Sequence, residues 1–391
     1  MKKLRNIKYW TYGVFCCAAL LSCSENLSDA VSGKEAGGEP ETFTMNYILP
    51  DTETGNDRIY PDTESGNRAM ESGHPFATRA SVVLIANEQE SKVSNVALLF
   101  FERDDYGNGL FVGRCDGTVE SNHLAKSGKV AVTLADPVKA DTGYNVLAIA
   151  NADSYFSSSS YLADYCKDKT ENRVRLLLTA TMPHTPKYVC EFPDAGLPMS
   201  GTAVKEAGKD MTVSLLRAVA RIDVKVADDK KDKIVLTEAT LRNVSSRIPV
   251  FNDPKDADAL MLASAKPYVQ AVNDTVIRGG LYLPEVFRTG FADDVASRSR
   301  QAACLLVNCH NKDYTGTRTW YRIDIDIDDE GVQYLRRNNA YTVEISRIRS
   351  LGAETPDEAY NGDATLIKAV TIPTEWKTPE GMDKPPVVDI Q

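Results

Sequence analysis

The sequence lacks the short motifs on which most enzyme classes depend. It contains no CxxC pair, HExxH, GxSxG, P-loop or Rossmann fingerprint, and its four histidines are scattered. Positive charge is also in short supply, with 45 Lys and Arg against 55 Asp and Glu and a formal net charge of -10. Repulsion from phosphate groups argues against a nucleic-acid surface. We expect no catalytic residues, no cofactor, no metal site and no nucleic-acid partner.

Two stretches that resemble reactive or metal-binding sites fit ordinary strands better. Cys304, Cys309 and His310 lie in CLLVNCHN, where the apolar run predicts a buried strand instead of a thiol activated by a base. The acidic stretch RIDIDIDDEG (322–331) lacks the glycine that a calcium loop needs at its sixth position. Its alternating Ile and Asp residues indicate a strand with an acidic outer face.

Cysteines are few, and three of the eight fall within the first 23 residues. An odd number follows, so complete pairing is excluded. One or two disulfides are compatible with an oxidising compartment, but the spacing does not choose a pattern. The five later cysteines are Cys115, Cys166, Cys190, Cys304 and Cys309.

Residues 1–22 predict a signal peptide. A basic start is followed by an apolar stretch from Tyr9 to Leu21, which is too short for a permanent membrane span. The stretch ends in LLSC, which resembles the lipobox of bacterial lipoproteins and implies cleavage before Cys23 and lipidation there. The alternative is an ordinary signal peptide with an incidental cysteine. No later segment approaches transmembrane length, so membrane attachment is expected at Cys23 alone.

Residues 23–79 have the composition of a pro-segment that contains one strand, over 41–50. In ETFTMNYILP the apolar residues Phe43, Met45, Tyr47 and Leu49 recur at every second position before Pro50 stops the pattern. A single apolar strand has to pair with something, because its edges and its apolar face are otherwise exposed.

The strand is followed by two similar units rich in Pro, Gly, Asp and Thr, over 50–60 and 61–70, which repeat after eleven residues and predict a loop. The seam lies in HPFATRASVVLIANEQESKV, where polar sequence gives way to strand-like sequence after Arg79. We predict proteolytic processing between Arg79 and Ala80, although Arg58 and Arg68 offer a trypsin-like enzyme two other positions.

From residue 80 onward, short apolar runs alternate with polar turns about every ten residues. This pattern predicts an all-β chain with two β-sandwich domains in tandem, over 80–205 and 206–391. A short helix is expected around 155–167, and NRVRLLLTA (172–180) fits either a strand or a helix. The chain closes with a short β-prone tip containing Val387, Val388 and Ile390.

Four local features resemble the type V pilins, or fimbrillins, of diderm anaerobic bacteria. They are the lipobox-type leader, the Arg-Ala junction followed by ESKVSNVALLFF, the segment SLLRAVARIDV and the late segment LRRNNAYTVEISRI. Each is short, and together they spread over most of the chain. The resemblance implies transthyretin-like sandwiches, export to the outer membrane as a palmitate-bearing lipoprotein, and a place in a cell-surface fimbrium that serves adhesion.

The resemblance also implies an assembly mechanism. An arginine-specific protease would cut after Arg79, and the removable strand Phe43–Leu49 would leave its sandwich. A C-terminal donor strand from another pilin subunit would then fill the vacancy, in a homo- or hetero-polymer, with Val387, Val388 and Ile390 as the expected donor residues. Arg79 and this apolar tip favour a stalk or tip subunit over an anchor.

A second hypothesis is a monomeric outer-membrane lipoprotein that binds a glycan or a host protein. Its marker would be a cluster of exposed aromatic side chains, for which Tyr155, Phe156, Tyr161 and Tyr165 are the candidates. Core packing explains these residues about as well.

Overall fold

The structure is a computed structural model. It describes residues 41–50, 84–85, 88–120, 126–156, 159–181, 184–185, 188–189, 192, 196–245, 247–251, 261–262, 268–288, 302–325, 332–349, 351–362, 367–374 and 376–377. Strands dominate these residues and the helices are short, which confirms the all-β prediction.

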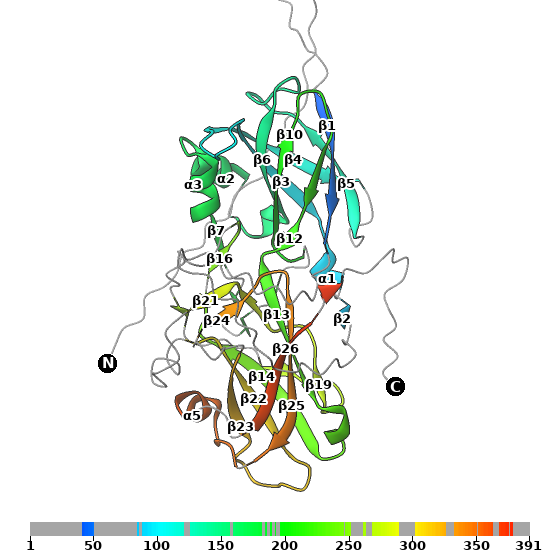
Figure 1. The fold of residues 1–391 in the computed structure, drawn as a ribbon, viewed down its shortest axis with the longest axis vertical. Coiled ribbons are helices and arrows are strands. Elements are labelled where there is room, and N and C mark those ends of the chain that lie inside the picture. The colour runs from blue at the N-terminus through cyan, green and yellow to red at the C-terminus, as the bar shows by residue number, and fades with distance from the viewer. Residues whose placement is uncertain are drawn as a thin grey trace, which may run out of the picture. The chain divides into compact units, whose positions relative to one another are not determined.

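The first half of the described chain builds an eight-stranded sheet in the order β11-β1-β5-β4-β3-β6-β10-β12 (Figure 1). Its strands are rich in Val, Leu, Ile and Phe, which suit a pleated surface with a buried face. Their bounds are β1 Thr42–Ile48, β3 Asn95–Glu102, β4 Phe111–Val119, β5 Ser127–Thr133, β6 Tyr144–Ala150, β10 Met199–Lys205, β11 Met211–Ser214 and β12 Leu216–Arg217.

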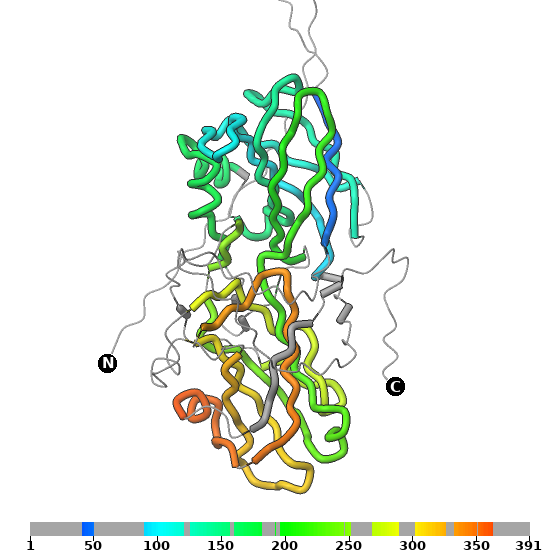
Figure 2. The backbone as a smooth tube through the Cα atoms, in the orientation of Figure 1, coloured from blue at the N-terminus to red at the C-terminus, as the bar shows by residue number. Residues whose placement is uncertain are grey.

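This sheet curls until its two sides approach each other. Strands β10 and β11 are far apart in the ladder order, yet a Cβ at Gly201 of β10 would lie 2.2 Å from the carbonyl oxygen of Ser214 on β11. The side chains inside the curl form one apolar core, to which β1 contributes Met45 and Tyr47. Figure 2 shows the tube of β1, in blue, running along the neighbouring strands of this sheet.

Short helices interrupt the strands. They are α1 Glu88–Ser91, η1 Ala152–Ser154, α2 Ser159–Cys166 and α3 Glu171–Leu177. Helix α2 falls where the sequence predicted one. The ambiguous segment 172–180 divides into α3 and the strand β7 Thr179–Thr181, because Thr170 caps the helix by accepting a hydrogen bond from the Arg173 amide and Leu178 is already extended.

The second half builds two sheets around another apolar core. The first has the order β19-β13-β25-β26, with β20 also paired to β13, and the second has the order β18-β14-β22-β23. The bounds are β13 Val219–Val226, β14 Ile234–Arg242, β18 Val269–Gln270, β19 Val276–Ile277, β20 Tyr282–Pro284, β22 Cys304–Asn311, β23 Trp320–Asp324, β25 Ala340–Ile348 and β26 Ile367–Thr374.

The remaining elements are short. Helical turns are η2 Asp228–Lys230 and α5 Pro356–Asn361. Paired two- and three-residue strands are β2 Leu84–Ile85 with β27 Trp376–Lys377, β7 with β16 Arg247–Pro249, β8 His184–Thr185 with β9 Tyr188–Val189, β15 Val244–Ser245 with β17 Met261–Leu262, and β21 Val286–Arg288 with β24 Gln333–Leu335.

The expected division at 205/206 precedes two strands that still pair within the eight-stranded sheet, β11 and β12. The apolar contacts change over later, since Val219 packs in the first core and Ala220 in the second. The physical reason is that adjacent residues of a strand point to opposite faces, so β13 begins with Val219 in the first core and turns Ala220, Ile222, Val224 and Val226 to the second. The polar, Gly-bearing stretch at 204–210 therefore connects two strands of the first sheet, β10 and β11, which are not paired with each other.

None of the helices in the described part of the chain is long and apolar enough to cross a membrane.

Candidate functional site

Strand β1 occupies an interior position in the eight-stranded sheet. It pairs antiparallel with β5, which is labelled beside it in Figure 1, and parallel with β11 on its other side. Met45 lies opposite Val130 of β5 and Met211 of β11. β1, which precedes Arg79 in the chain, is thus paired on both edges with strands that follow Arg79.

The alternation seen in the sequence places one face of β1 in the core. Met45, Tyr47 and Leu49 are fully buried, whereas Ile48 is 41% exposed. Phe43 is half-buried and packs edge-on against the ring of Phe100, with centroids 6.4 Å apart. This face accounts for most of the apolar contribution of the strand.

Backbone hydrogen bonds continue beyond both ends of the strand. The Leu49 amide donates to the Lys126 carbonyl at 2.7 Å, and the Leu134 amide donates to the Glu41 carbonyl at 2.9 Å. On the other edge, the Leu215 amide donates to the Ile48 carbonyl at 2.9 Å. Removal of β1 would therefore leave two sheet edges unpaired as well as an open core.

Tyr47 has a tight partner in the sheet. It lies directly opposite Gly128, and a Cβ at Gly128 would come within 2.5 Å of the Tyr47 ring and hydroxyl. The ring therefore fills the volume that a side chain at position 128 would need, as in other cross-strand aromatic–glycine pairs. The phenol is buried without a hydrogen-bond partner among the described residues, and burial raises its pKa.

The first described helix after the seam is held by a buried cluster of polar and charged residues, Glu90, Arg221, Asp223 and Tyr282. The Arg221 guanidinium donates to Glu90 at 2.7 Å and lies 3.1 Å from Asp223. The Tyr282 hydroxyl donates to the other oxygen of Glu90. Burial raises the pKa of Tyr282 well above its usual value, and the Glu90 carboxylate adds to the rise. The cluster fixes the chain shortly after the seam.

A second buried arginine links this helix to the end of β1. The Arg217 Nε donates to the Glu90 carbonyl at 2.8 Å, and its Nη1 donates to the Asn338 side chain at 3.0 Å. Asn338 also donates to the carbonyl of Pro50 at 3.5 Å. Both segments that flank residues 51–83 thus reach the same polar network.

The other predicted site residues lie outside the described residues. These are the lipidation residue Cys23, the processing pair Arg79 and Ala80, and the donor residues Val387, Val388 and Ile390. The described strands on either side are β2, shortly after the seam, and β27, before the tail, and they pair in parallel.

The aromatic candidates for ligand binding pack mainly on one another. The rings of Phe156 and Tyr161 stack with centroids 5.9 Å apart, and those of Tyr161 and Tyr165 with centroids 6.0 Å apart. Tyr155 donates to the Gly196 carbonyl at 2.7 Å, and burial raises its pKa. Packing thus accounts for three of the four rings, and Tyr161 remains exposed.

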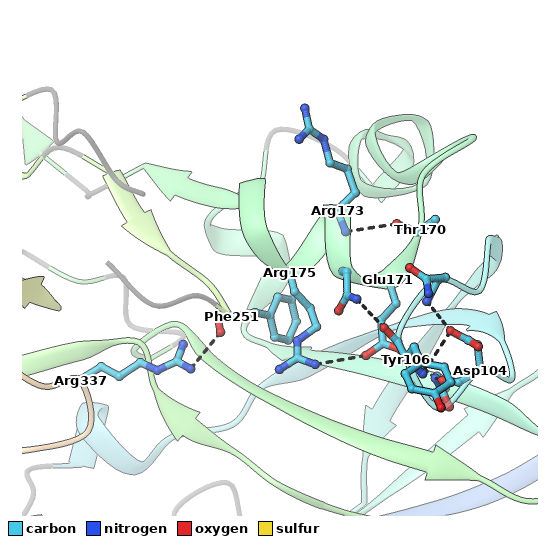
Figure 3. Close-up of polar contacts among 11 residues, drawn as sticks. Asp104, Tyr106, Thr170, Glu171, Arg173, Arg175, Phe251 and Arg337 are labelled. Atoms are coloured by element: carbon cyan, nitrogen blue, oxygen red, sulfur yellow. Dashed lines mark hydrogen bonds and ion pairs between the residues drawn. The ribbon is translucent and has the colours of Figure 1, made fainter. Parts of the chain in front are cut away.

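A different aromatic residue, Tyr106, is displayed on a fixed loop. Its side chain is 80% exposed, while its amide donates to Asp104 and its carbonyl accepts from Asn172 of α3 at 2.5 Å. Figure 3 shows this loop beside α3, where Glu171 and Arg175 form an ion pair at 3.6 Å. Figure 3 also shows Arg337, which donates to the Phe251 carbonyl at 3.1 Å.

The thiols do not have the properties of nucleophiles. Cys115, Cys166, Cys304 and Cys309 are buried and unpaired with one another. Burial raises the pKa of Cys304 to about 12 and raises that of Cys309 as well, which is opposite to activation. Within the described ranges, no three His, Cys, Asp or Glu residues are grouped to hold a metal ion.

Comparisons with known proteins find fimbrial and cell-adhesion structures. The tip fimbrial protein Mfa3 from Porphyromonas gingivalis, solved with a C-terminal truncation, is 13% identical, with 74% of this chain and 96% of that chain covered and a TM-score of 0.48. A candidate cell adhesion protein from Bacteroides eggerthii is 13% identical, with 86% and 97% covered and a TM-score of 0.49. Another from Parabacteroides distasonis is 12% identical, with 87% and 98% covered and a TM-score of 0.49. No family model and no curated protein matches the chain.

Sequence reasoning found the strand but missed the residues that receive it. Gly128 stands in SGKVAV and carries no local signal of its role, because the need for a glycine arises from the ring across the strand. Glu90 and Asn338 are polar residues in polar surroundings, and only their long-range partners explain their burial. The buried Arg217 and Arg221 among apolar neighbours were the available hint.

Proposed function

We propose that this chain is a structural subunit, stalk or tip, of a type V fimbrium that serves adhesion. It is exported as a lipoprotein through Cys23, cut after Arg79 at the outer membrane by an arginine-specific protease, and polymerised at the cell surface by β-strand donation. The observation that carries the proposal is β1, which precedes the seam and yet occupies an interior place in a sheet made otherwise of residues that follow the seam.

A cut in residues 51–83 removes the covalent connection between β1 and the rest of the domain but leaves the contacts of β1 as they are. While the connection is intact, it keeps the strand at an effective concentration on the order of millimolar, so a strand that leaves soon returns. After the cut, β1 is a separate peptide that is held only by its hydrogen bonds and its buried side chains. Its departure is then favoured by dilution.

The vacancy left by β1 is too costly to persist. Burying Met45, Tyr47 and Leu49 stabilises the domain by about 1.5–3 kcal/mol each, or roughly 5–9 kcal/mol as an upper bound. A domain of net stability of about 5–15 kcal/mol tolerates such a loss only if another strand replaces the first. Strand addition from a second subunit supplies it, and this chain in turn offers its own C-terminal residues Val387, Val388 and Ile390 as a proposed donor.

The test is a denaturing gel of the cell-surface fraction, loaded without boiling. The parent protein should give a ladder of polymers, and Arg79→Ala should give monomer alone. Arg58→Ala and Arg68→Ala are matched controls in the same pro-segment and should keep the ladder. A ladder that persists in Arg79→Ala would refute cleavage at this seam.

The alternative is a monomeric surface lipoprotein that binds a glycan or a host protein. The exposed rings of Tyr161 and Tyr106 are the observations that favour it. A single monomer band in the parent protein and in all three variants would support this alternative and would exclude the polymer.

A further inference from the structure

The place of Tyr47 in the sheet is shaped for an aromatic ring. We call it the Tyr47 seat and define it by Gly128 of β5 and Val213 of β11, which lie opposite Tyr47 on its two sides. The position of Met45 is different, because Val130 and Met211 both bring side chains to it. Only at the seat does one neighbour contribute no side chain at all.

An aliphatic residue would underfill this seat. A Cβ added at Gly128 would lie only 2.5 Å from the Cε1, the Cζ and the hydroxyl oxygen of Tyr47, so the ring occupies the space over Gly128. A valine or isoleucine in place of Tyr47 does not extend that far, so a void would remain over Gly128 and the surrounding side chains would lose contacts.

The seat selects for the ring and not for the hydroxyl. The phenol oxygen is buried and has no hydrogen-bond partner in the described part of the chain. A buried hydroxyl that makes no hydrogen bond weakens binding relative to a side chain that carries no hydroxyl. Phenylalanine should therefore fit the seat at least as well as tyrosine.

The proposed donor tail of this chain carries no aromatic residue. The apolar side chains that the stretch 378–391, TPEGMDKPPVVDIQ, offers are those of Met382, Val387, Val388 and Ile390, along with its prolines, and none of them has a ring like that of Tyr47. The nearest upstream aromatic is Trp376. A strand with Trp376 in the seat would put Thr374 and Thr378 at the two flanking buried positions, which Met45 and Leu49 fill with apolar side chains in β1.

We infer that the groove vacated by β1 takes its replacement strand from a different kind of subunit, one whose donor strand carries an aromatic residue at the Tyr47 seat, and not from a second copy of this chain. This inference rests on the proposed strand exchange. If so, this subunit accepts a strand from a different kind of subunit, and it lies at a junction between two unlike subunits of the fimbrium. Shape at the Tyr47 seat provides the discrimination, because the two other fully buried positions of β1 hold the aliphatic side chains of Met45 and Leu49.

The test uses the full chain cut after Arg79 and a fluorescently labelled peptide of residues 41–50. Competing peptides are the unlabelled parent, its Tyr47→Phe and Tyr47→Val versions, and residues 379–391. We expect the Phe version to match the parent within about threefold, and the Val version and the tail to compete at least about 30-fold less well, as cavity formation requires. Equal competition by the Val version or the tail would overturn the inference.

A groove variant provides the reciprocal test. In Gly128→Ala the new Cβ occupies the space of the ring, so the preference for the Phe version over the Val version should fall at least about tenfold. Gly143→Ala, where a Cβ meets only the Lys205 carbonyl oxygen at 3.6 Å, is the matched control and should keep the parent preference. An unchanged preference in Gly128→Ala would contradict the assigned seat.

The outcomes separate the inference from the proposed function. If the labelled parent peptide never enters the cut protein, strand exchange itself is wrong and the inference falls with it. If the peptide enters but the groove ignores the residue at the seat, strand exchange stands and only the choice of an unlike partner is wrong. Should Gly128→Ala fail to fold, the peptide series on the parent protein decides alone.

Discussion

Glu90 illustrates how much of this fold depends on single buried side chains. It lies in a four-residue helix that has little stability of its own. Its carboxylate is buried between Arg221 and Tyr282, which come from two strands of the second half of the chain. The helix is therefore held in place by the ion pair with Arg221 and by the hydrogen bonds from Tyr282 and Arg217.

Substitution Glu90→Ala should destabilise the protein by about 3–5 kcal/mol, because it leaves the Arg221 charge buried with part of its compensation lost. Urea unfolding followed by circular dichroism measures the change. The matched control is Glu206→Ala, which removes an exposed ion pair with Lys209 and should leave the unfolding midpoint close to that of the parent. Equal losses in both variants would show that burial of the pair is unimportant.

Tyr282 gives the fold a sensitivity to alkaline pH. Burial and Glu90 raise the pKa of its phenol well above 10, while a tyrosine in the unfolded chain ionises near that value. Above about pH 10 the unfolded state therefore binds fewer protons than the folded state, and the free energy of unfolding decreases as pH rises. Below pH 10 the contribution is complete.

Tyr282→Phe should flatten this decrease, because phenylalanine has no proton to lose. The measurement is the urea midpoint as a function of pH, from neutral to alkaline, for the parent and the variant. Buried Tyr47 and Tyr155 also have raised pKa values, so part of the slope should remain. Identical slopes in the two proteins would contradict the role assigned to Tyr282.

At the scale of elements, β1 itself could be predicted from the sequence, whereas the strands that pair with it could not. Its period-two pattern and the stop at Pro50 predicted a strand at the right residues, because alternation is a local property. Its neighbours were not predictable, since β5 and β11 are selected by long-range register and by the space over Gly128. For the same reason the expected division at 205/206 falls before β11 and β12. Both strands pair within the eight-stranded sheet, and β11 pairs with β1, which is distant in the sequence.

A charge on the buried face of β1 should prevent the strand from pairing. Met45→Asp places an unpaired carboxylate in the core and should lower the stability of the uncut protein by more than about 3 kcal/mol. Ile48→Asp is the control on the same strand, at an exposed position, and should have a small effect. Hydrogen exchange of the β5 and β11 amides reports the loss, and equal protection in both variants would refute the assigned register.

For the whole molecule, the important feature is that the chain is anchored on both sides of the connection 51–83. Pro50 and the chain from Glu88 onward are both tied to the folded region, through Asn338 and Arg217, on either side of the expected cut at Arg79. Under the proposed function, the precursor would be stable while intact and would become competent for assembly once β1 is a separate peptide. The interior position of β1 in the sheet is the observation on which this proposal rests.

The most direct measurement is the amount of the 41–50 peptide in assembled fibres. Purified fibres and the uncut precursor would be digested and the peptide counted per subunit by mass spectrometry against an isotope-labelled standard. The account predicts one copy per subunit in the precursor and essentially none in the fibres, because another strand has replaced β1. One retained copy per subunit in the fibres would contradict it, since β1 would then keep its place throughout assembly.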